Sequence, residues 1–166
     1  MGRIAVSSTW VTAVAALIIL SVVGFSMSAL AQSDNVIVPG VRVGPVAIGM
    51  SPDQVAQVFG SPSRRQIEGN PPVNIIHHYP DLMVSYRAGV APRVFSLYTQ
   101  SSRWVTDKGI RVGNSGSSVP QAHGAPLREE CGTGTRDSSC TAFYRGLLIS
   151  VVLSSSRVVG FVVQGD

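Results

Sequence analysis

The amino-terminal part of this 166-residue sequence almost entirely lacks charge, because Arg3 is the only charged residue among the first 33. Residues 11–25 form an uncharged apolar run, and small residues ending at Ala31 follow in the A-x-A pattern that signal peptidase recognises. We therefore predict a signal peptide over residues 1–31, cleaved after Ala31, and a periplasmic or secreted mature chain. Residues 11–31 are also long enough to span a bilayer, so an uncleaved anchor is the alternative. We expect contact with a membrane only in that second case.

The sequence also lacks any concentration of charge of one sign. It has 13 basic residues, all arginine except Lys108, against 9 acidic ones. The basic residues are scattered rather than gathered with aromatic residues into a stripe, so nucleic acid is not an expected partner. The net charge of +4 is mild and fits an acidic partner or an anionic envelope surface, although solvated arginine is the commoner explanation.

Cysteine is scarce, with Cys131 and Cys140 the only two, both in the part predicted to be exported. Export makes a disulfide between them the natural interpretation. It would tie a loop rich in glycine and serine between the helix and the strands of the carboxy-terminal half. A zinc site would need further ligands, and the neighbouring sequence offers none. We therefore predict a structural cross-link and no metal.

The sequence also lacks a recognisable catalytic motif. It has no G-x-S-x-G, and its three histidines are not arranged as ligands or bases. His77 and His78 are adjacent in a predicted strand, so their side chains point to opposite faces. His123 lies on the apolar face of a predicted helix, and Glu129 and Glu130 fit a solvated helix end. We predict no enzymatic activity and no cofactor.

Two stretches of the sequence, 64 residues apart, have the same residues at six corresponding positions. The matching positions are Gly49, Ser51, Val55, Gln57, Gly60 and Pro62 in the first stretch and Gly113, Ser115, Val119, Gln121, Gly124 and Pro126 in the second. A second pair of stretches, at 79–100 and 144–164, matches at nearly the same spacing. This indicates a tandem duplication. We predict a first repeat over residues 32–104 and a second repeat, with the disulfide, over residues 105–166.

Each repeat is expected to hold a short helix followed by antiparallel strands. Residues 52–59 predict a helix, because Ser51 opens an S-x-x-Q capping box and Gly60 suits the position after the last turn. Residues 63–72 are expected to hold a second helical turn before a loop. The predicted strands that follow are 74–79, 82–88 and 93–100.

The helix of the second repeat is expected to be weaker. Pro120 would fall in the interior of a helix capped by Ser115, which costs roughly 3 kcal/mol, so we expect the helix to begin later with Ser118 as its cap. The fold class predicted is α+β. Two tandem helix–antiparallel-sheet repeats would form one extended sheet with the helices on one face.

Alternation along the predicted strands separates two faces of the sheet. The core face is expected to hold Leu82, Val84, Tyr86, Phe95, Leu97, Leu147, Ile149, Val151, Val159 and Phe161. The other face is too apolar to be fully solvated: Met83, Ser85, Arg87, Val94, Ser96, Tyr98, Leu148, Ser150, Val152, Val158, Gly160 and Val162. Such a face is typical of a binding surface, or else a terminal segment or loop covers it. The candidate contacts to a protein partner are Met83, Arg87, Tyr98 and Trp104.

The motif G-M-S-x-x-Q-V-x-x-x-x-G-x-P at residues 49–62 resembles the BamE/SmpA-like envelope proteins, which assist outer-membrane assembly. Two such units in one exported chain resemble the fold of the secreted β-lactamase inhibitor proteins. The second unit departs from the motif, with Asn114 for Met and Ser118 for Gln, and the chain has no lipoprotein cysteine. The turn at 88–92 also lacks the carboxylate that the inhibitors place in the enzyme. The resemblance implies a fold and protein–protein binding, but not β-lactamase inhibition.

The function expected is therefore that of an exported, non-catalytic module that binds another exported or envelope protein, as its inhibitor or accessory. One alternative is a structural or assembly factor of the envelope, tethered by the uncleaved amino-terminal segment. Another is a protein that binds a small ligand or lipid in the concavity of the sheet.

Overall fold

The computed structural model describes residues 35–133 and 138–165, so the predicted signal peptide and its cleavage site lie outside the described residues. The described hydrophobic core runs from Ile37 to Val163. Within the described residues, no helix is long and apolar enough to cross a membrane.

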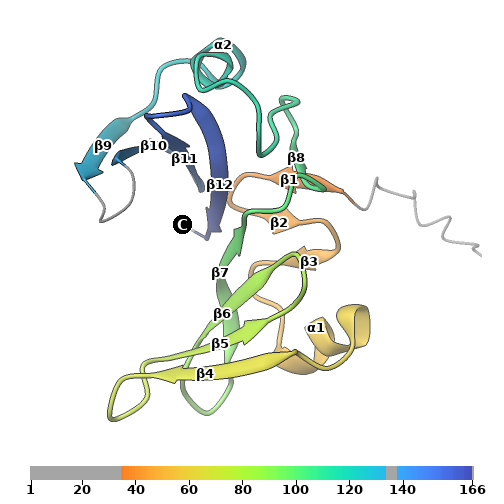
Figure 1. Ribbon diagram of the computed structural model, residues 1–166. Coiled ribbons are helices and arrows are strands. Elements are labelled where there is room, and N and C mark those ends of the chain that lie inside the picture. Colours follow the sequence, from red (N-terminus) through yellow and green to blue (C-terminus); the bar gives the residue numbers. More distant parts are fainter. Residues whose placement is uncertain (1–34, 134–137, 166) are drawn as a thin grey trace, which may run out of the picture. The chain divides into compact units, whose positions relative to one another are not determined.

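Eight antiparallel strands form the main sheet, in the order β4-β5-β6-β7-β12-β11-β10-β9 (Figure 1). The strands are β4 (Arg64–Glu68), β5 (Asn74–His78), β6 (Met83–Arg87), β7 (Arg93–Thr99), β9 (Arg128–Thr133), β10 (Ser138–Tyr144), β11 (Leu147–Val152) and β12 (Arg157–Gln164). The predicted strands at 74–79, 82–88 and 93–100 are confirmed as β5, β6 and β7. The central neighbours β7 and β12 join the two halves of the chain.

Four short strands form a second, mixed sheet, in the order β3-β2-β1-β8. They are β1 (Val36–Val38), β2 (Arg42–Val43), β3 (Val46–Ala47) and β8 (Val105–Thr106), and β1 runs parallel to β8. The backbone N–H of Gly40, in the β1–β2 turn, donates a hydrogen bond to the carbonyl oxygen of Gly146 (2.9 Å) and so links the two sheets. Strands of two or three residues are too short for alternation to reveal them, so the sequence did not predict this sheet.

Helix α1 (Pro52–Phe59) has the predicted bounds and the predicted cap. The Oγ of Ser51 accepts a hydrogen bond from the backbone N–H of Gln54 (3.2 Å), and the Oε1 of Gln54 accepts one from the backbone N–H of Ser51 (2.9 Å). This reciprocal pair satisfies two of the donors that a helix start leaves without intrahelical partners.

Helix α2 (Ser118–His123) begins late, as expected, but its N-cap is Ser117 and not Ser118. No side-chain hydrogen bond caps it. Pro120 lies in its first turn, where the backbone N–H groups have no intrahelical acceptor. The N–H that proline lacks therefore costs the helix no hydrogen bond.

The segment that follows each helix is a strand. The predicted helical turn at 63–72 is wrong, because residues 64–68 form β4 and pair with β5. Glu129 and Glu130 likewise lie in β9 and not at a helix end. Strands β4 and β9 are the two edges of the main sheet. Charged side chains are common on edge strands because they discourage pairing with other chains. Here they replace the apolar alternation from which the sequence could have predicted β4 and β9.

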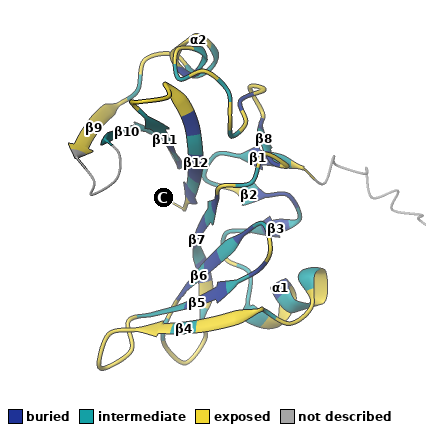
Figure 2. Cartoon of the chain, viewed as in Figure 1, coloured by how far each residue is buried: buried dark blue, intermediate teal, exposed yellow. Residues whose placement is uncertain are grey.

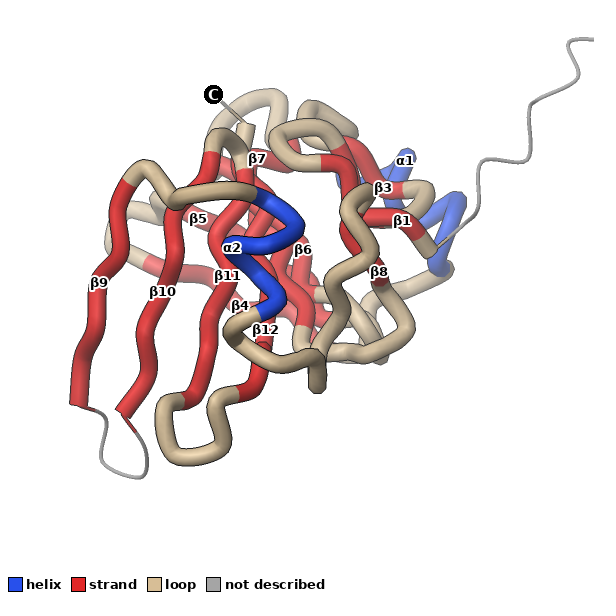
Figure 3. Tube along the Cα trace, turned by 90° about the horizontal axis from the view of Figure 1, so that it is seen from above, coloured by secondary structure: helices blue, strands red, loops and turns tan. Residues whose placement is uncertain are grey.

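Both helices pack on the same face of the main sheet, as expected (Figures 2 and 3). Val55 of α1 and Val119 of α2 are buried in one cluster with Val84 of β6 and Ile149 of β11. The small sheet contributes to the same cluster through Ile37 and other buried residues. The helices and the small sheet therefore cover one face of the main sheet and leave the other uncovered by any described helix.

Two β-bulges make part of the predicted assignment of residues to the two faces of the sheet wrong. Phe95 in β7 and Val159 in β12 are extra residues without a partner opposite them, so the alternation reverses on either side of each. Val94 and Val158 are therefore buried in the core where Phe95 and Val159 were expected, and Val151 is only partly buried. The other predicted core residues are buried: Leu82, Val84, Tyr86, Leu97, Leu147, Ile149 and Phe161.

The predicted disulfide between Cys131 and Cys140 is present. The two residues lie opposite each other on β9 and β10. The bond therefore ties the edge strand of the main sheet to its neighbour, and does not lie between the helix and the strands as expected. A disulfide is consistent with export.

Candidate binding face

A single row of cross-strand partners runs across the face of the main sheet that the helices leave uncovered. Each member lies directly opposite the next in the strand register. From β4 to β9 the residues are Arg64, His78, Met83, Tyr98, Val162, Leu148, Phe143 and Arg128. We call these eight residues the cross-strand row. It is apolar and aromatic in the middle and ends in an arginine at each edge.

The six inner members of the cross-strand row are partly buried and the two terminal arginines are exposed. Tyr98 lies in the central strand β7, next to the glycine of β12. A Cβ atom placed on Gly160 would lie 3.4 Å from Cε2 of Tyr98, so the missing side chain makes room for the tyrosine ring. Burial raises the pKa of Tyr98, so its phenol stays protonated at neutral pH and keeps a hydroxyl donor on this face.

The structure brings two of the four predicted contact residues together. Met83 and Tyr98 are direct neighbours in the row. Arg87 lies on the same face at the end of β6, where its guanidinium carbon is 4.8 Å from the centre of the Phe95 ring. Trp104 is fully buried, and its Nε1 donates a hydrogen bond to the carbonyl oxygen of Asp81 (3.1 Å). Trp104 is therefore a core residue and offers no surface to a partner.

The two arginines of the row are held differently. The guanidinium carbon of Arg128 lies 4.1 Å from the centre of the Phe143 ring, and its Nη1 is 3.3 Å from Oε1 of Glu130. Within the described ranges, Arg64 makes no salt bridge. Arg64 is therefore available to a carboxylate of a partner, whereas a partner's carboxylate at Arg128 would compete with Glu130.

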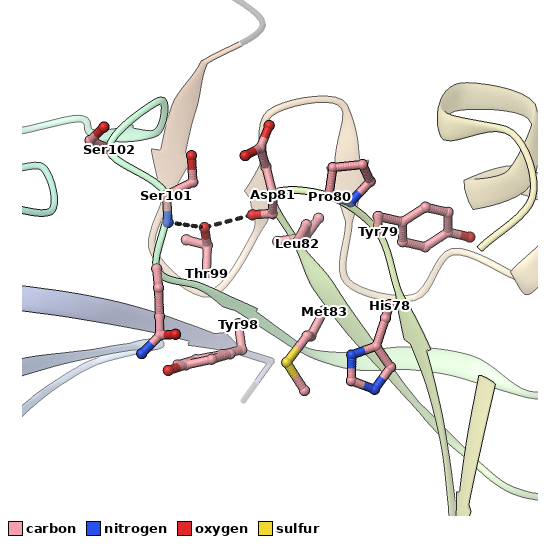
Figure 4. A pocket seen from close by; sticks show the side chains of 11 residues that line it. His78, Tyr79, Pro80, Asp81, Leu82, Met83, Tyr98, Thr99, Ser101 and Ser102 are labelled. Atoms are coloured by element: carbon pink, nitrogen blue, oxygen red, sulfur yellow. Dashed lines mark hydrogen bonds between the residues drawn. The ribbon is translucent and has the colours of Figure 1, made fainter. Parts of the chain in front are cut away.

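A hollow of about 570 Å³ opens beside the β5–β7 half of the row (Figure 4). His78, Met83 and Tyr98 lie on one side of it, and Asp81, Thr99 and Ser101 on the other. The second side is fixed by hydrogen bonds, because Oγ1 of Thr99 donates to the carbonyl oxygen of Asp81 (2.7 Å) and accepts from the backbone N–H of Ser101 (3.1 Å). The hollow is thus polar on one wall and partly apolar on the other.

The hollow contains the residue types of a hydrolytic triad, but they are not joined. Among the described residues, no hydrogen bond links any two of His78, Asp81 and Ser101. The carboxylate of Asp81 faces Nη1 of Arg103 (3.5 Å), and Oγ of Ser101 accepts from the backbone N–H of Arg103 (3.2 Å). A nucleophile and its base must lie within hydrogen-bond reach, whereas Ser101 and Asp81 both contact Arg103 and neither contacts His78.

A second hollow, of about 330 Å³, lies beside the other half of the row. Arg128, Phe143 and Leu148 of the row line it together with Tyr144 and Gln164. Burial, and to a smaller degree the charge of Glu129, raises the pKa of Tyr144, whose hydroxyl donates to the carbonyl oxygen of Gly124 (3.2 Å). The two hollows therefore flank the same row at matching positions.

The described residues contain one group with metal-ligand character, formed by Glu129, Cys131 and Cys140. The two cysteines are joined in the disulfide, so neither offers a thiolate. Of the three histidines, His77 is buried with its ring edge-on to Tyr86, and His123 contacts Tyr144 and the hydroxyl of Thr106. None of these groups forms a ligand set with two others.

Sequence reasoning missed four members of the cross-strand row: Arg64, His78, Phe143 and Arg128. Arg64 and Arg128 lie on strands that the sequence did not predict, and Phe143 was not assigned to a face. Arg64 and Arg128 are 64 residues apart, which is the spacing of the repeat. That spacing is the signal from which the sequence could have predicted that they occupy corresponding positions.

No family model matches the chain, and no curated protein sequence matches it significantly. The solved structures that are similar to it include the following three. An extracellular protein containing an SCP domain from Bacillus anthracis is 12% identical, over 72% of this chain and 44% of that one, with a TM-score of 0.48. A cysteine-rich secretory protein from Staphylococcus aureus is 11% identical over 72% and 43%, with a TM-score of 0.46. A DUF4309 family protein, YjgB, from Bacillus subtilis is 11% identical over 76% and 88%, with a TM-score of 0.48. The chain spans less than half the length of the first two.

These comparisons correct the resemblance inferred from the motif at 49–62. No BamE/SmpA-like or β-lactamase-inhibitor family model matches, and the similar solved structures are other proteins. The motif residues instead serve a local purpose: Ser51 and Gln54 cap α1, and Gly60 ends it. Such a pattern recurs wherever a short capped helix is needed, so it does not identify a family.

Proposed function

We propose that this chain is an exported, non-catalytic module that binds another exported or envelope protein across the cross-strand row. The row supports the proposal, because partly buried apolar side chains with an arginine at each end are unusual on a face that only water covers. Tyrosine and arginine, both present in the row, are also the residue types that contribute most at protein interfaces.

The partner surface that fits is apolar in its middle and acidic at both ends. The row crosses seven strand spacings of about 4.8 Å, so the path from Arg64 to Arg128 along the sheet is roughly 34 Å. Carboxylates on the partner near Arg64 and Arg128 would complete the charge complementarity, while apolar side chains would cover Met83, Tyr98 and Leu148.

We propose further that the row arose by duplication of one helix–sheet unit. Its halves correspond position by position: Arg64 with Arg128, His78 with Phe143, Met83 with Leu148, and Tyr98 with Val162. The bulges at Phe95 and Val159 have the same spacing. The amino-terminal half has His78 and Tyr98 where the carboxy-terminal half has Phe143 and Val162, so the two halves of the row present different chemistry to a partner between the same two arginine ends.

The test uses residues 32–166 with the disulfide formed, immobilised and exposed to the producer's envelope and secreted fractions. A partner retained by the wild type should be lost with Met83→Ala/Tyr98→Ala. The charge reversal Arg64→Glu/Arg128→Glu should weaken retention roughly tenfold at low salt, because two exposed charges then repel the partner's acids. Lys108→Glu, in the exposed turn after β8 on the helix-covered side of the main sheet, makes the same kind of charge reversal away from the row and should have no effect.

Retention that is equal for the wild type and the row variants would refute the proposal, as would retention of nothing by the wild type. The second outcome would favour one alternative, a small ligand or lipid in the hollow beside His78 and Tyr98. The volume of about 570 Å³ and the mixed walls of that hollow suit a small molecule. Native mass spectrometry of the exported chain would then show a bound molecule, which the wild type keeps and Tyr98→Ala loses.

The other alternative is a chain tethered to the membrane by its uncleaved amino-terminal segment. The mass of the chain isolated from the producer distinguishes the two forms. A chain that begins at Gln32 would exclude the tether, and a chain that retains residues 1–31 would exclude cleavage after Ala31.

A further inference from the structure

Two neighbouring hairpin tips expose aliphatic side chains at one end of the main sheet. The β4–β5 tip and the β6–β7 tip are adjacent, because Asn74 pairs with Arg87 and the backbone N–H of Ala88 donates to the carbonyl oxygen of Val73 (2.9 Å). Ile67 is 58% exposed, Val73 is 59% exposed, and Val90 in the middle of the β6–β7 turn is fully exposed. Figure 2 shows both tips largely exposed at the lower end of the sheet.

The same tips carry a pair of like charges. Arg87 and Arg93 lie directly opposite each other on β6 and β7, an arrangement that destabilises a sheet unless something offsets it. In the part of the chain that the structure describes, neither forms a salt bridge. The one acidic group at these tips is Glu68, whose carboxylate accepts hydrogen bonds from Asn74 (3.4 Å) and Gln66 (3.5 Å).

We propose that the two tips dock on an anionic phospholipid membrane. We call Val73, Val90, Arg87 and Arg93, together with Ile67 at the same end of the sheet but on the opposite face from the two arginines, the hairpin-tip surface. Exposed aliphatic side chains next to cationic ones are the composition that binds at a membrane interface, where the apolar groups enter the headgroup region and the cations meet lipid phosphates. Anionic headgroups would also neutralise the repulsion between Arg87 and Arg93. This contact needs no amino-terminal anchor.

The hairpin-tip surface is separate from the cross-strand row. Arg87 lies four residues beyond Met83 along β6, about 13 Å away at the rise of a β-strand. A membrane at the tips would therefore leave the row free for a protein partner. The chain would then present its binding face beside the membrane surface.

The β11–β12 hairpin provides a matched control within the same sheet. Leu153 at its tip is 49% exposed, but its arginine is engaged, because Nη1 of Arg157 donates to the carbonyl oxygen of Gly113 (2.7 Å). This hairpin thus has an exposed aliphatic residue without a free arginine pair.

The test measures partitioning of residues 32–166, disulfide-bonded, between buffer and sedimented vesicles. The vesicles are phosphatidylcholine alone, or phosphatidylcholine mixed with phosphatidylglycerol. The wild type should bind the mixed vesicles and bind the neutral ones weakly, and binding should fall as salt is raised. Arg87→Gln/Arg93→Gln should lower partitioning about 30-fold, since each arginine near an anionic surface contributes about fivefold.

Val90→Ser should lower partitioning several-fold at any salt concentration, because it removes apolar contact and no charge. It has no packing role, so its folding is not in question. Leu153→Ser and Arg145→Gln should bind as the wild type does. The proposal is overturned if the wild type does not sediment with mixed vesicles, if the arginine variants bind as well as the wild type, or if the two controls lose as much binding as the tip variants.

Discussion

The contact between Gly40 and Gly146 gives a prediction whose size follows from the structure. Gly146 has a φ of +67°, which L side chains rarely adopt. A Cβ atom placed on it would lie 2.4 Å from both Cα and N of Gly40, closer than real Cβ atoms approach a backbone. Gly146→Ala should therefore separate the small sheet from the main sheet.

The expected loss of unfolding free energy has two parts. The left-handed backbone costs a non-glycine residue about 1–2 kcal/mol. Relief of the clash breaks the 2.9 Å hydrogen bond from Gly40 to Gly146 and disturbs the packing around it, which adds about 2 kcal/mol. Gly49→Ala is the matched control, because Gly49 also has a positive φ (+87°) but nothing lies within 4 Å of a Cβ atom there.

Urea unfolding of residues 32–166 measures both losses. Gly146→Ala should lose about 3–4 kcal/mol and Gly49→Ala about 1–2 kcal/mol, so the midpoint of the first should fall about twice as far. Equal losses for the two variants would show that the close approach of the glycines does not hold the sheets together, and would refute the reasoning.

Three further predictions concern stability. Burial, and to a smaller degree the charge of Arg65, lowers the pKa of His77 below 6.5 in the folded protein. The unfolded state therefore takes up the proton first, and the unfolding free energy falls as the pH drops below 6.5. Urea titrations at several pH values should show a smaller fall in unfolding free energy at acid pH for His77→Phe than for the wild type. Cys131→Ser/Cys140→Ser should lose about 2–3 kcal/mol in a denaturant titration, as expected for a short closed loop, and an unchanged midpoint would contradict this. Ser51→Ala should lose about 1 kcal/mol in thermal unfolding, whereas Ser117→Ala, which removes no capping hydrogen bond, should lose little.

Local signals in the sequence predicted the elements that they specify directly. The capping box of α1 involves residues three positions apart, and regular alternation marked β5, β6 and the start of β7. The disulfide followed from the scarcity of cysteine and the expected export. Met83 and Tyr98 were both assigned to the open face, and the register places them side by side.

Features that depend on register could not be predicted in the same way. A bulge adds one residue to a strand without changing its composition, so Phe95 and Val159 were assigned to the wrong face. The edge strand β4 is too polar to alternate clearly, so its pairing, and with it the place of Arg64 in the row, emerged only from the structure. Trp104 follows β7 and turns into the core to reach the carbonyl oxygen of Asp81, which no local pattern indicates.

The most direct test of the cross-strand row is site-specific photo-crosslinking in the producer's exported fraction. Benzoylphenylalanine replaces Tyr98 at the centre of the row or, as a control, the half-exposed Val41 in the β1–β2 turn. We expect a protein adduct from position 98 that position 41 does not give, and that Arg64→Glu/Arg128→Glu weakens. An adduct from position 41 alone, or the same adduct from both positions, would contradict binding across the row.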